Sequence, residues 1–264
     1  MNLDLLYIGN ISLDEIKCFD GSTRHIWGGS ALYSALASRL VFQGSIGVYS
    51  IVGNDFDLKI FDENRITFIG KKLNNRKSNV FIIEEKKNKC FLKNKKYLKF
   101  PNINQEINVK HLHVSFRKGV EIEKIFSNNI KFKHLSIDVM HSSIAYIKKY
   151  LINYLEYIDY IFCNKLEYDA IKNILNENIE IFITDEHRCV KYYRNKYKKN
   201  YNVPKILNKN IKSTTGAGDT FIGGFLGCYL KTKNKKLSIE TAIKISGLSI
   251  LNYGNLELIK NGKI

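Results

Sequence analysis

Segments of strand type and segments of helix type alternate from Val109 onward. The strand-type segments are His111–Ser115, His134–Asp138, Tyr157–Cys163 and Glu180–Thr184. The helix-type segments are Gly119–Ser127, Ser142–Leu151, Asn164–Leu175, Gly216–Leu230 and Ser238–Leu251. Such alternation indicates βαβ units, in which helices cover both faces of a parallel sheet. The pattern predicts a three-layer α/β fold with a mostly parallel central sheet.

The N-terminal part fits the same architecture. Leu3–Gly9 and Ser45–Val52 are expected to be strands, because both are apolar and bounded by glycine or polar residues. Ser30–Leu40 repeats small and apolar residues at helical spacing after Gly28-Gly29, which predicts a helix.

Two further ranges are expected to form a small β lid on a single domain that spans residues 1–264. The range 10–27 is polar, and we expect it to be irregular with a turn at Asp20-Gly21. The range 67–100 alternates short β-rich pieces with lysine-rich turns, which predicts an antiparallel flap. An ordinary surface meander is the alternative for this range.

Charge and cysteine usage limit the class of protein. The formal net charge of +17 suits a nucleic-acid or membrane-surface protein, but the lysines are scattered and form no long basic arm. Biased residue usage explains the charge better, so we expect no specific nucleic-acid partner. Five cysteines without CxxC spacing argue against disulfides and zinc, and favour the cytoplasm. The longest apolar run, Phe221–Leu230, is far short of the about 20 residues of a membrane span.

The strongest chemical signal lies in Ser213-Thr214-Thr215-Gly216-Ala217-Gly218-Asp219. Gly216, Ala217 and Gly218 have almost no side chain, so backbone N–H groups can approach an anion at a helix start. Asp219 suits a base that takes a proton from a hydroxyl attacking a phosphate. The helix dipole also favours an acid in a first turn, so both interpretations stay open on these residues alone.

This segment resembles the C-terminal signature Asp-Thr-x-Gly-Ala-Gly-Asp of the ribokinase-like (PfkB) carbohydrate kinase family. The resemblance runs from about Leu3 to Tyr253 and implies a ribokinase-like fold. It implies that Asp219 is the catalytic base and that Gly216, Ala217 and Gly218 form the anion hole. It also implies that Thr214, Gly216 and Gly218 contact the nucleotide.

A second segment, Asn164-Lys165-Leu166-Glu167, resembles the family's Asn-x-x-Glu motif. The resemblance implies that Asn164 binds nucleotide phosphates and that Glu167 orders the water around Mg²⁺. Thr184 resembles the first residue of another family segment beside the nucleotide. Asn164 is also a natural N-cap with Glu167 at the N3 position, so helix capping alone would explain the pair.

Two N-terminal segments contain the candidate residues for binding the substrate. Gly9-Asn10-Ile11-Ser12-Leu13-Asp14 resembles the end of the family's first strand, which implies that Asp14 binds substrate hydroxyls. A carboxylate can accept two hydroxyl hydrogen bonds, whereas a solvent-facing turn residue is the alternative. Gly28 and Gly29 open a helix as in the family's N-terminal motif, and with Tyr33 they are implied to contact substrate. Ribokinase has Asn where Tyr33 stands, and the tyrosine resembles inositol-kinase-like members.

Two departures from the family pattern matter for the ligands. Ser213 replaces the leading Asp, which helps to hold potassium in members that need it, so activation by a monovalent cation is not expected. Glu186 and Cys189 stand where the family usually has glycines beside the nucleotide. The bulkier loop is expected to alter nucleotide affinity or donor choice.

The expected function is an ATP- and Mg²⁺-dependent kinase that phosphorylates a hydroxyl of a small polyol, namely a sugar, cyclitol or nucleoside. One alternative is a non-catalytic, ligand-binding relative, which the departures at Ser213 and Glu186 motivate. A basic nucleic-acid-binding protein is the other, which the charge motivates. A lid edge could also pair with a second copy in a homodimer.

Overall fold

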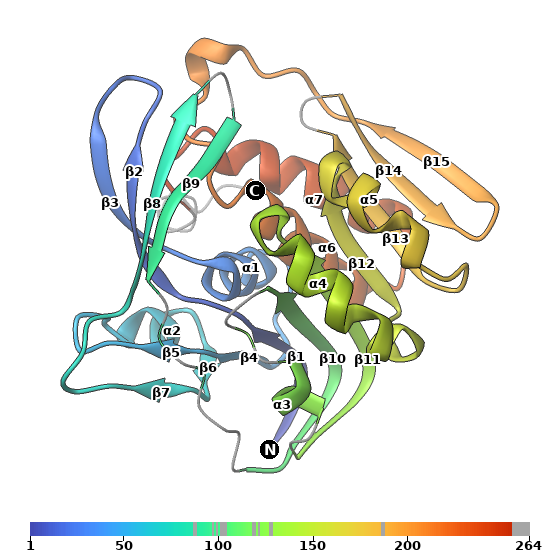
Figure 1. Ribbon diagram of the computed structural model, residues 1–264, viewed down its shortest axis with the longest axis horizontal. Helices are drawn as coiled ribbons and strands as arrows, with labels where there is room; N and C mark the ends of the chain where they lie inside the picture. Colours follow the sequence, from blue (N-terminus) through green and yellow to red (C-terminus); the bar gives the residue numbers. More distant parts are fainter. Residues whose placement is uncertain are drawn as a thin grey trace.

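The computed structural model describes residues 1–86, 89–96, 98, 100, 105–117, 120, 122–126, 129–185 and 188–254. In these ranges, nine strands form one sheet in the order β15-β14-β13-β12-β11-β10-β1-β4-β6 (Figure 1). Their bounds are β1 Asn2–Ile8, β4 Ile46–Tyr49, β6 Ile66–Phe68, β10 Ile107–Phe116, β11 Ile130–Val139, β12 Tyr160–Asn164, β13 Glu180–Asp185, β14 Cys189–Arg194 and β15 Tyr197–Asn202.

The prediction of a mostly parallel sheet is confirmed. Pairing is parallel from β6 through β13 along the sheet, and only β14 and β15 add antiparallel edges. The antiparallel hairpin was not expected, because β15 is dominated by lysine, asparagine and tyrosine and carries little apolar signal. The strand expected from Tyr157 begins at Tyr160, since 152–157 forms a 3₁₀ helix.

Helices cover both faces of the sheet. The helices α1 (Ser30–Arg39), α6 (Ala217–Thr232) and α7 (Lys235–Ser249) cover one face, and α3 (Ile122–Phe126), α4 (Ile144–Leu151) and α5 (Lys165–Ile171) cover the other. Alternate residues of β1 enter the two cores: Leu5 and Tyr7 pack on the α6 side, Leu6 and Ile8 on the α4 side. This is the period of two that a sheet buried on both faces requires.

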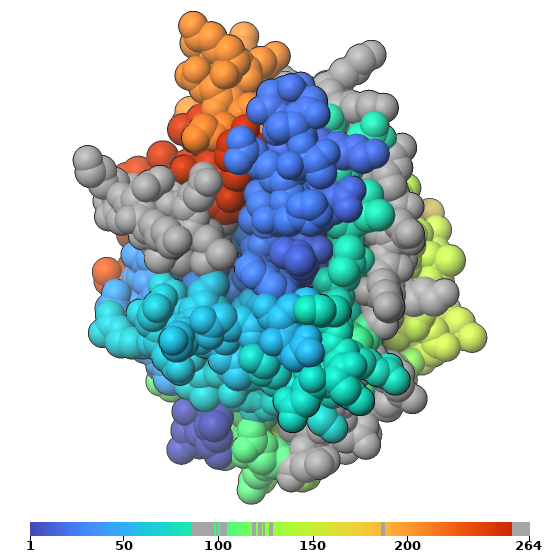
Figure 2. All heavy atoms as spheres, turned by 90° about the vertical axis from the view of Figure 1, so that its left-hand side faces the viewer, coloured from blue at the N-terminus to red at the C-terminus, as the bar shows by residue number. Residues whose placement is uncertain are grey.

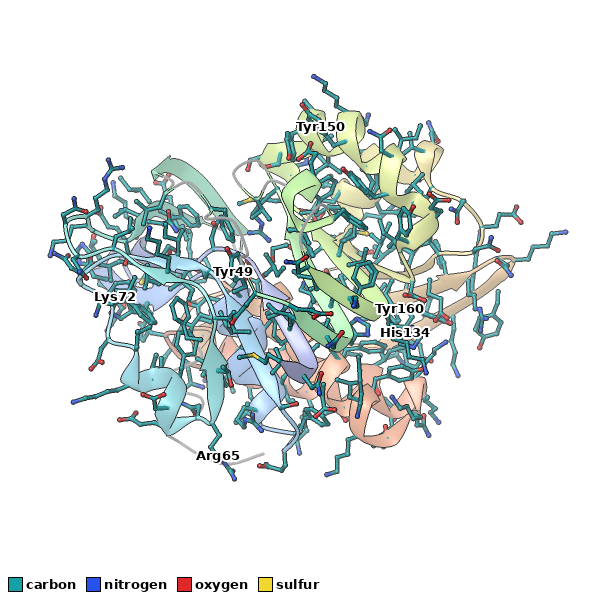
Figure 3. The ribbon with its side chains drawn as sticks, turned by 90° about the horizontal axis from the view of Figure 1, so that it is seen from below. Tyr49, Arg65, Lys72, His134, Tyr150 and Tyr160 are labelled. Atoms are coloured by element: carbon teal, nitrogen blue, oxygen red, sulfur yellow. The ribbon has the colours of Figure 1, made fainter. Side chains whose placement is uncertain are left out.

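The two cores are visible when the molecule of Figure 1 is seen from below. In Figure 3, Tyr150 lies beside the yellow-green helices, and Tyr160 lies on the side of the salmon-coloured α6 and α7. Tyr160 belongs to an aromatic cluster that includes Phe162, Phe182 and Phe225. This packing anchors α6, the helix whose first turn carries Asp219.

A smaller, separate sheet, consistent with a lid, has the order β3-β2-β8-β9. Its strands are β2 Ser12–Lys17, β3 Thr23–Gly28, β8 Asn79–Lys86 and β9 Lys89–Lys96. Figure 2 shows its outer side, where the blue β2–β3 hairpin adjoins the cyan segment of the chain. Strands β2 and β8 run parallel, whereas the β2–β3 and β8–β9 pairs are antiparallel.

The expectation of an irregular 10–27 segment is wrong, because β2 and β3 form a regular hairpin there. Its strand signal is hidden because the buried face of β2 begins with two polar residues, Ser12 and Asp14. In the range 67–100, β6 joins the main sheet and β7 (Lys71–Lys72) pairs with β5 (Ile51–Val52). The short helix α2 (Lys59–Glu63) precedes β6. The lid strands of this range therefore begin at Asn79.

Within the described residues, no helix combines the length and apolar character that crossing a membrane requires.

Candidate active site

Two predicted site residues, Asn164 and Thr184, lie at the carboxyl ends of the parallel strands β12 and β13. Gly9 follows β1 at the same edge of the sheet, and Arg117, which was not predicted, follows β10. Strand β1 is flanked by β4 on one side and by β10 on the other, so the order in which strands are added to the sheet reverses at β1. Ligands of open α/β sheets bind at such a switch point.

The start of α6 forms an open cradle for an anion. Gly216, the N-cap, has a φ of 78°, a left-handed conformation that favours glycine. A Cβ added to Gly218 would meet no atom within 4 Å, so the space above it is open. The N–H groups of Gly218 and Asp219 have no backbone acceptor in the described chain outside the helix, and a first turn offers none inside it. These free donors are what a phosphate oxygen requires.

Asp219 lies in the first turn of α6, at the inner end of this cradle. The Ser34 hydroxyl of α1 donates to the backbone oxygen of Asp219 at 2.9 Å, which ties the two helices together. Burial raises the pKa of the Asp219 carboxyl to about 7, and Asp138 and Glu167 add to the rise while Arg117 opposes it. A carboxylate that titrates near neutral pH is suited to proton transfer.

Asp14 reaches the same site from the lid. It lies on β2 rather than on the end of β1, and it is 2% exposed. The Ser12 hydroxyl donates to Asp14 Oδ1 at 2.6 Å. Burial raises the pKa of Asp14 to about 7, and the negative charge of Asp219 contributes to the rise. The structure therefore brings the predicted substrate carboxylate and the predicted base within electrostatic range of each other.

Tyr33 lies between Asp14 and the anion cradle at Gly216, and it is 1% exposed. A Cβ added to Gly28 would lie 2.5 Å from Asp14 Oδ2 and 2.9 Å from the Tyr33 hydroxyl. A Cβ added to Gly216 would lie 2.3 Å from the Tyr33 ring. Gly29 has a φ of 97° and packs against the backbone oxygen of Asn10. These glycines are therefore required for Tyr33 and Asp14 to fit.

Two buried polar side chains near Gly29 and Tyr33 were not predicted from the sequence to be site residues. Both atoms of the Asn10 amide, and the hydroxyl of Ser30, are buried without a hydrogen-bond partner among the described residues. A buried polar group without a partner destabilises a protein, so such groups are candidates to bind a polar ligand. The signal was present, since Asn10 belongs to the same segment as Asp14.

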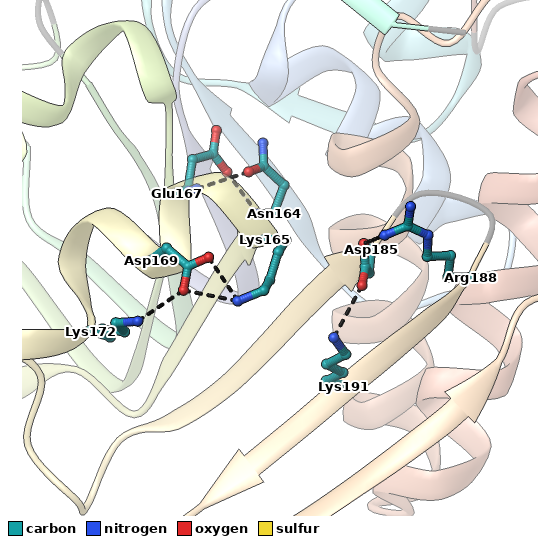
Figure 4. A network of polar contacts seen from close by, with 8 residues as sticks. All are labelled: Asn164, Lys165, Glu167, Asp169, Lys172, Asp185, Arg188 and Lys191. Carbon is teal, nitrogen blue, oxygen red and sulfur yellow. Dashed lines mark hydrogen bonds and ion pairs between the residues drawn. The ribbon is translucent and has the colours of Figure 1, made fainter.

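Asn164 and Glu167 form a complete capping box at the start of α5 (Figure 4). Glu167 N donates to Asn164 Oδ1 at 2.9 Å, and Asn164 N donates to Glu167 Oε2 at 2.7 Å. The N–H of His141 donates to the other carboxylate oxygen, Glu167 Oε1, at 3.0 Å. Thr184 pairs with Asn164 in the parallel register of β12 and β13. Burial raises the pKa of Glu167 to about 7.

Arg117 and Asp138 form a buried ion pair that the sequence analysis did not identify. Burial alone would raise the pKa of Asp138, but Arg117 and His113 hold it below its usual range. His113 Nε2 lies 3.3 Å from Asp138 Oδ1. Arg117 also lowers the pKa of Asp219, which places a guanidinium within electrostatic range of the predicted base. Both residues lie at strand ends, where the switch-point rule would have found them.

The loop before Gly216 is occupied by a side chain of the lid. The N–H of Thr214 donates to Glu85 Oε1 at 2.8 Å, and the Ser213 hydroxyl donates to the same oxygen at 2.8 Å. On the nucleotide side, Glu186 lies outside the described residues, and Cys189 begins β14. Asp185 pairs with Lys191 at 3.1 Å and with Arg188 at 3.7 Å beside Thr184 (Figure 4).

Comparison with known proteins agrees with this architecture. Residues 62–260 match the pfkB family of carbohydrate kinases. A nucleoside kinase of Methanocaldococcus jannaschii is 26% identical over 235 residues, which cover 80% of this chain and 74% of that protein. A crystal structure of the nucleoside kinase from that organism superposes with a TM-score of 0.76 at 18% identity, covering 98% of both chains.

Two ribokinase structures share the fold as well. Ribokinase of Cryptococcus neoformans in complex with ADP has a TM-score of 0.77 at 14% identity, with 97% of this chain and 96% of that chain covered. An Escherichia coli protein described as a ribokinase II, in complex with ATP and Mg²⁺, has a TM-score of 0.70 at 17% identity, with 97% and 95% covered. These relatives are nucleoside kinases and ribokinases, so they lend no support to the likeness of Tyr33 to inositol-kinase-like members.

The family match covers most of the chain, and the matched range contains the glycine-rich helix start, Asp219 and the Asn164–Glu167 pair. The predicted fold agrees with the solved structures along nearly the whole length. The chain is therefore a member of the PfkB family of carbohydrate kinases, phosphotransferases with an alcohol group as acceptor.

Proposed function

We propose that this enzyme transfers the γ-phosphate of ATP, bound with Mg²⁺, to a hydroxyl of a nucleoside. The observation that carries the proposal is the approach of two carboxylates within electrostatic range: Asp14, buried on the lid, and Asp219, in the first turn of α6 at the anion cradle. One carboxylate can hold acceptor hydroxyls while the other takes the proton of the attacking hydroxyl.

The face of the lid that carries Asp14 favours a nucleoside over a fully hydroxylated sugar. Asp14 lies opposite Ile26 on β3 and Phe81 on β8, so the three side chains share one face of the sheet. Ile16 and Ile83 extend the same apolar cluster. An apolar wall beside a hydroxyl-binding carboxylate complements a base attached to a ribose. The nucleoside kinase of Methanocaldococcus jannaschii, which is similar in sequence over 80% of this chain, supports the same class of acceptor.

The proposed transfer step assigns a role to each group. The acceptor hydroxyl gives its proton to Asp219 as its oxygen forms a bond to the γ-phosphorus. The bond from that phosphorus to the bridging oxygen breaks, and ADP leaves. The free N–H groups of Gly218 and Asp219 stabilise the charge on the transferring phosphoryl group. Arg117 adds a positive charge within electrostatic range of Asp219.

The residues present fit a magnesium ion held mainly by phosphates and water. Asp138, Glu167 and Asp219 place three carboxylates around one guanidinium, an arrangement that repels a polyphosphate unless a cation accompanies it. Among the described residues, no group of three His, Cys, Asp or Glu side chains forms a ready metal cage. Mg²⁺ commonly binds through one or two carboxylates, with water and substrate phosphates completing its shell. Glu167 and Asp138 would hold the hydrated ion, which neutralises the phosphates.

A coupled assay of ADP release tests the proposal. The acceptors are a set of purine and pyrimidine nucleosides, compared with ribose, fructose 6-phosphate and myo-inositol, in the presence of Mg²⁺. The highest kcat/KM is expected for a nucleoside, and the Asp219→Asn variant should be inactive on all acceptors. A higher kcat/KM for a free sugar or an inositol would refute the nucleoside assignment.

A further inference from the structure

Glu85 of the lid strand β8 inserts its carboxylate into the loop that precedes the anion cradle. It is 3% exposed, and its Oε1 accepts from the Ser213 hydroxyl at 2.8 Å. The backbone N–H groups of Thr214 and Thr215 donate to the same oxygen at 2.8 and 3.1 Å. The Thr215 hydroxyl donates at 3.0 Å. Residues about half the chain apart are thus joined through a single oxygen atom.

These contacts are the compensation that a buried carboxylate needs. Ionised groups are rarely buried without charge-assisted hydrogen bonds or an opposite charge. Glu85 has no ion pair with a described residue, and its Oε2 has no hydrogen-bond partner in the described chain. Two successive backbone N–H groups with adjacent hydroxyls form a small anion-binding concavity. The loop 213–215 therefore holds Glu85, and Glu85 in turn holds the shape of the loop.

The loop leads directly into the transfer site. The N–H of Ala217 donates to the backbone oxygen of Thr214 at 3.3 Å, so the position of Thr214 sets the first turn of α6. Strand β8 also contacts the substrate side, since its Phe81 lies opposite Asp14. Alternate burial along β8 puts Phe81, Ile83 and Glu85 on the same inner face as Asp14. Asp14 and Glu85 are therefore carried on the same inner face of the lid.

We propose that Glu85 is a positioning residue that couples closure of the lid over the acceptor to the shape of the phosphoryl-transfer loop. The inference rests on the proposed function. When the lid opens, the loop loses the acceptor for two N–H groups and three hydroxyls, and the start of α6 loses its support. The transfer site is then complete only when the lid is closed on an acceptor, which limits transfer to water.

Hydrogen exchange tests the contact without any substrate. The amides of Thr214 and Thr215, followed by NMR or in a peptide covering 213–219, should be protected in the wild type. In Glu85→Ala and Glu85→Gln they should exchange about tenfold faster or more, because the charged acceptor is gone. Glu84→Gln is the matched control, since Glu84 is the neighbouring acid on the opposite face of β8. Unchanged protection in both Glu85 variants would overturn the proposal.

Kinetics separate positioning from general stability. Glu85→Gln should lower kcat by about tenfold or more while the Kd of ATP stays within about threefold, because the donors at Gly218 remain. Loss of protection with unchanged kcat would show that the contact does not serve transfer. A wild type without activity on nucleosides would refute the proposed acceptor alone, since the exchange measurement stands independently of it.

A second substitution, Ser213→Asp, is expected to have opposite effects on kcat and on amide exchange in the wild type and in Glu85→Ala. The Ser213 hydroxyl lies 2.8 Å from Glu85 Oε1 and 3.2 Å from the N–H of Thr215. Ser213→Asp in the wild type places two carboxylates together, so it should lower kcat and speed exchange. In Glu85→Ala, the same Ser213→Asp change supplies a carboxylate to the loop and should restore protection and part of kcat. Harm or no effect in both backgrounds would contradict the assigned role of Glu85.

Discussion

Replacement of Asp219 by Asn should remove phosphoryl transfer while the site keeps its shape. The amide has nearly the size of the carboxylate, but it cannot take a proton at neutral pH. The backbone at this position is held by the Ser34 hydroxyl and by the packing of α6, not by the Asp219 side chain. Removing a positioned general base lowers a rate by about 10²–10⁴, and we expect kcat to fall within that range.

The same substitution should leave nucleotide binding intact and stabilise the fold. Asp219 lies in range of the carboxylates of Asp14, Asp138 and Glu167, so removing its charge weakens the repulsion of ATP. The Kd of ATP should therefore stay equal or fall. Burial raises the pKa of Asp219 in the folded protein to about 7, above the ordinary pKa of an aspartate. Its ionisation therefore destabilises the fold increasingly as the pH rises from that ordinary pKa to about 7. Asn removes this effect, and Tm should rise more near pH 8 than near pH 5.

The kcat, the Kd of ATP and the Tm are measured on one preparation. A coupled assay gives kcat, calorimetric titration gives the Kd of ATP, and thermal unfolding gives Tm. Asp169→Asn is the matched control, because Asp169 lies on the exposed side of α5, where it pairs with Lys165 and Lys172. It should leave kcat unchanged and should not raise Tm. If Asp219→Asn retains kcat within about tenfold of wild type, the base lies elsewhere and the assignment of the whole segment fails.

Three further predictions concern pH, substrate and ions. The value of kcat/KM should fall as the pH drops through about 7, because Asp219, the proposed base, has a raised pKa and becomes protonated there. A fall in kcat/KM centred near pH ~4 would contradict this. Asp14→Ala should raise the KM of the acceptor strongly, abolish any preference for ribo- over deoxynucleosides and leave the Kd of ATP nearly unchanged; an unaltered acceptor KM removes Asp14 from the site. Activity should be similar in sodium, potassium and tetramethylammonium buffers, because Ser213 offers no carboxylate. A large, saturable rise with potassium alone would show that other groups build an ion site.

Local patterns account for what could be predicted from the sequence. The βαβ alternation predicted parallel strands, because apolar segments of that length and order can be buried only between two helix layers. The glycines before Asp219 predicted a helix start with almost no side chains, since a left-handed N-cap such as Gly216 depends on neighbouring residues alone. The capping box of Asn164 and Glu167 likewise spans three residues, so its spacing is visible in the chain.

Local polarity also misled where burial came from a distant partner. Strand β2 was expected to be irregular because Ser12 and Asp14 are polar, yet both are buried on the inner face of the lid. The polar strand β15 was missed because it is an edge strand with little apolar surface. Which residues a strand buries depends on what packs against it, and that information lies outside the segment.

Only the tertiary structure joined the parts of the site. Asp14 and Asp219 come within electrostatic range because the lid hairpin folds over the start of α6. Arg117 and Asp138 meet because β10 and β11 are neighbours in the sheet. Glu85 reaches Ser213 across about half of the chain, and no spacing or periodicity records such a contact. The local sequence determined the chemistry of each segment, and long-range packing decided which segments act together, because distance in space is set by the fold and not by position along the chain.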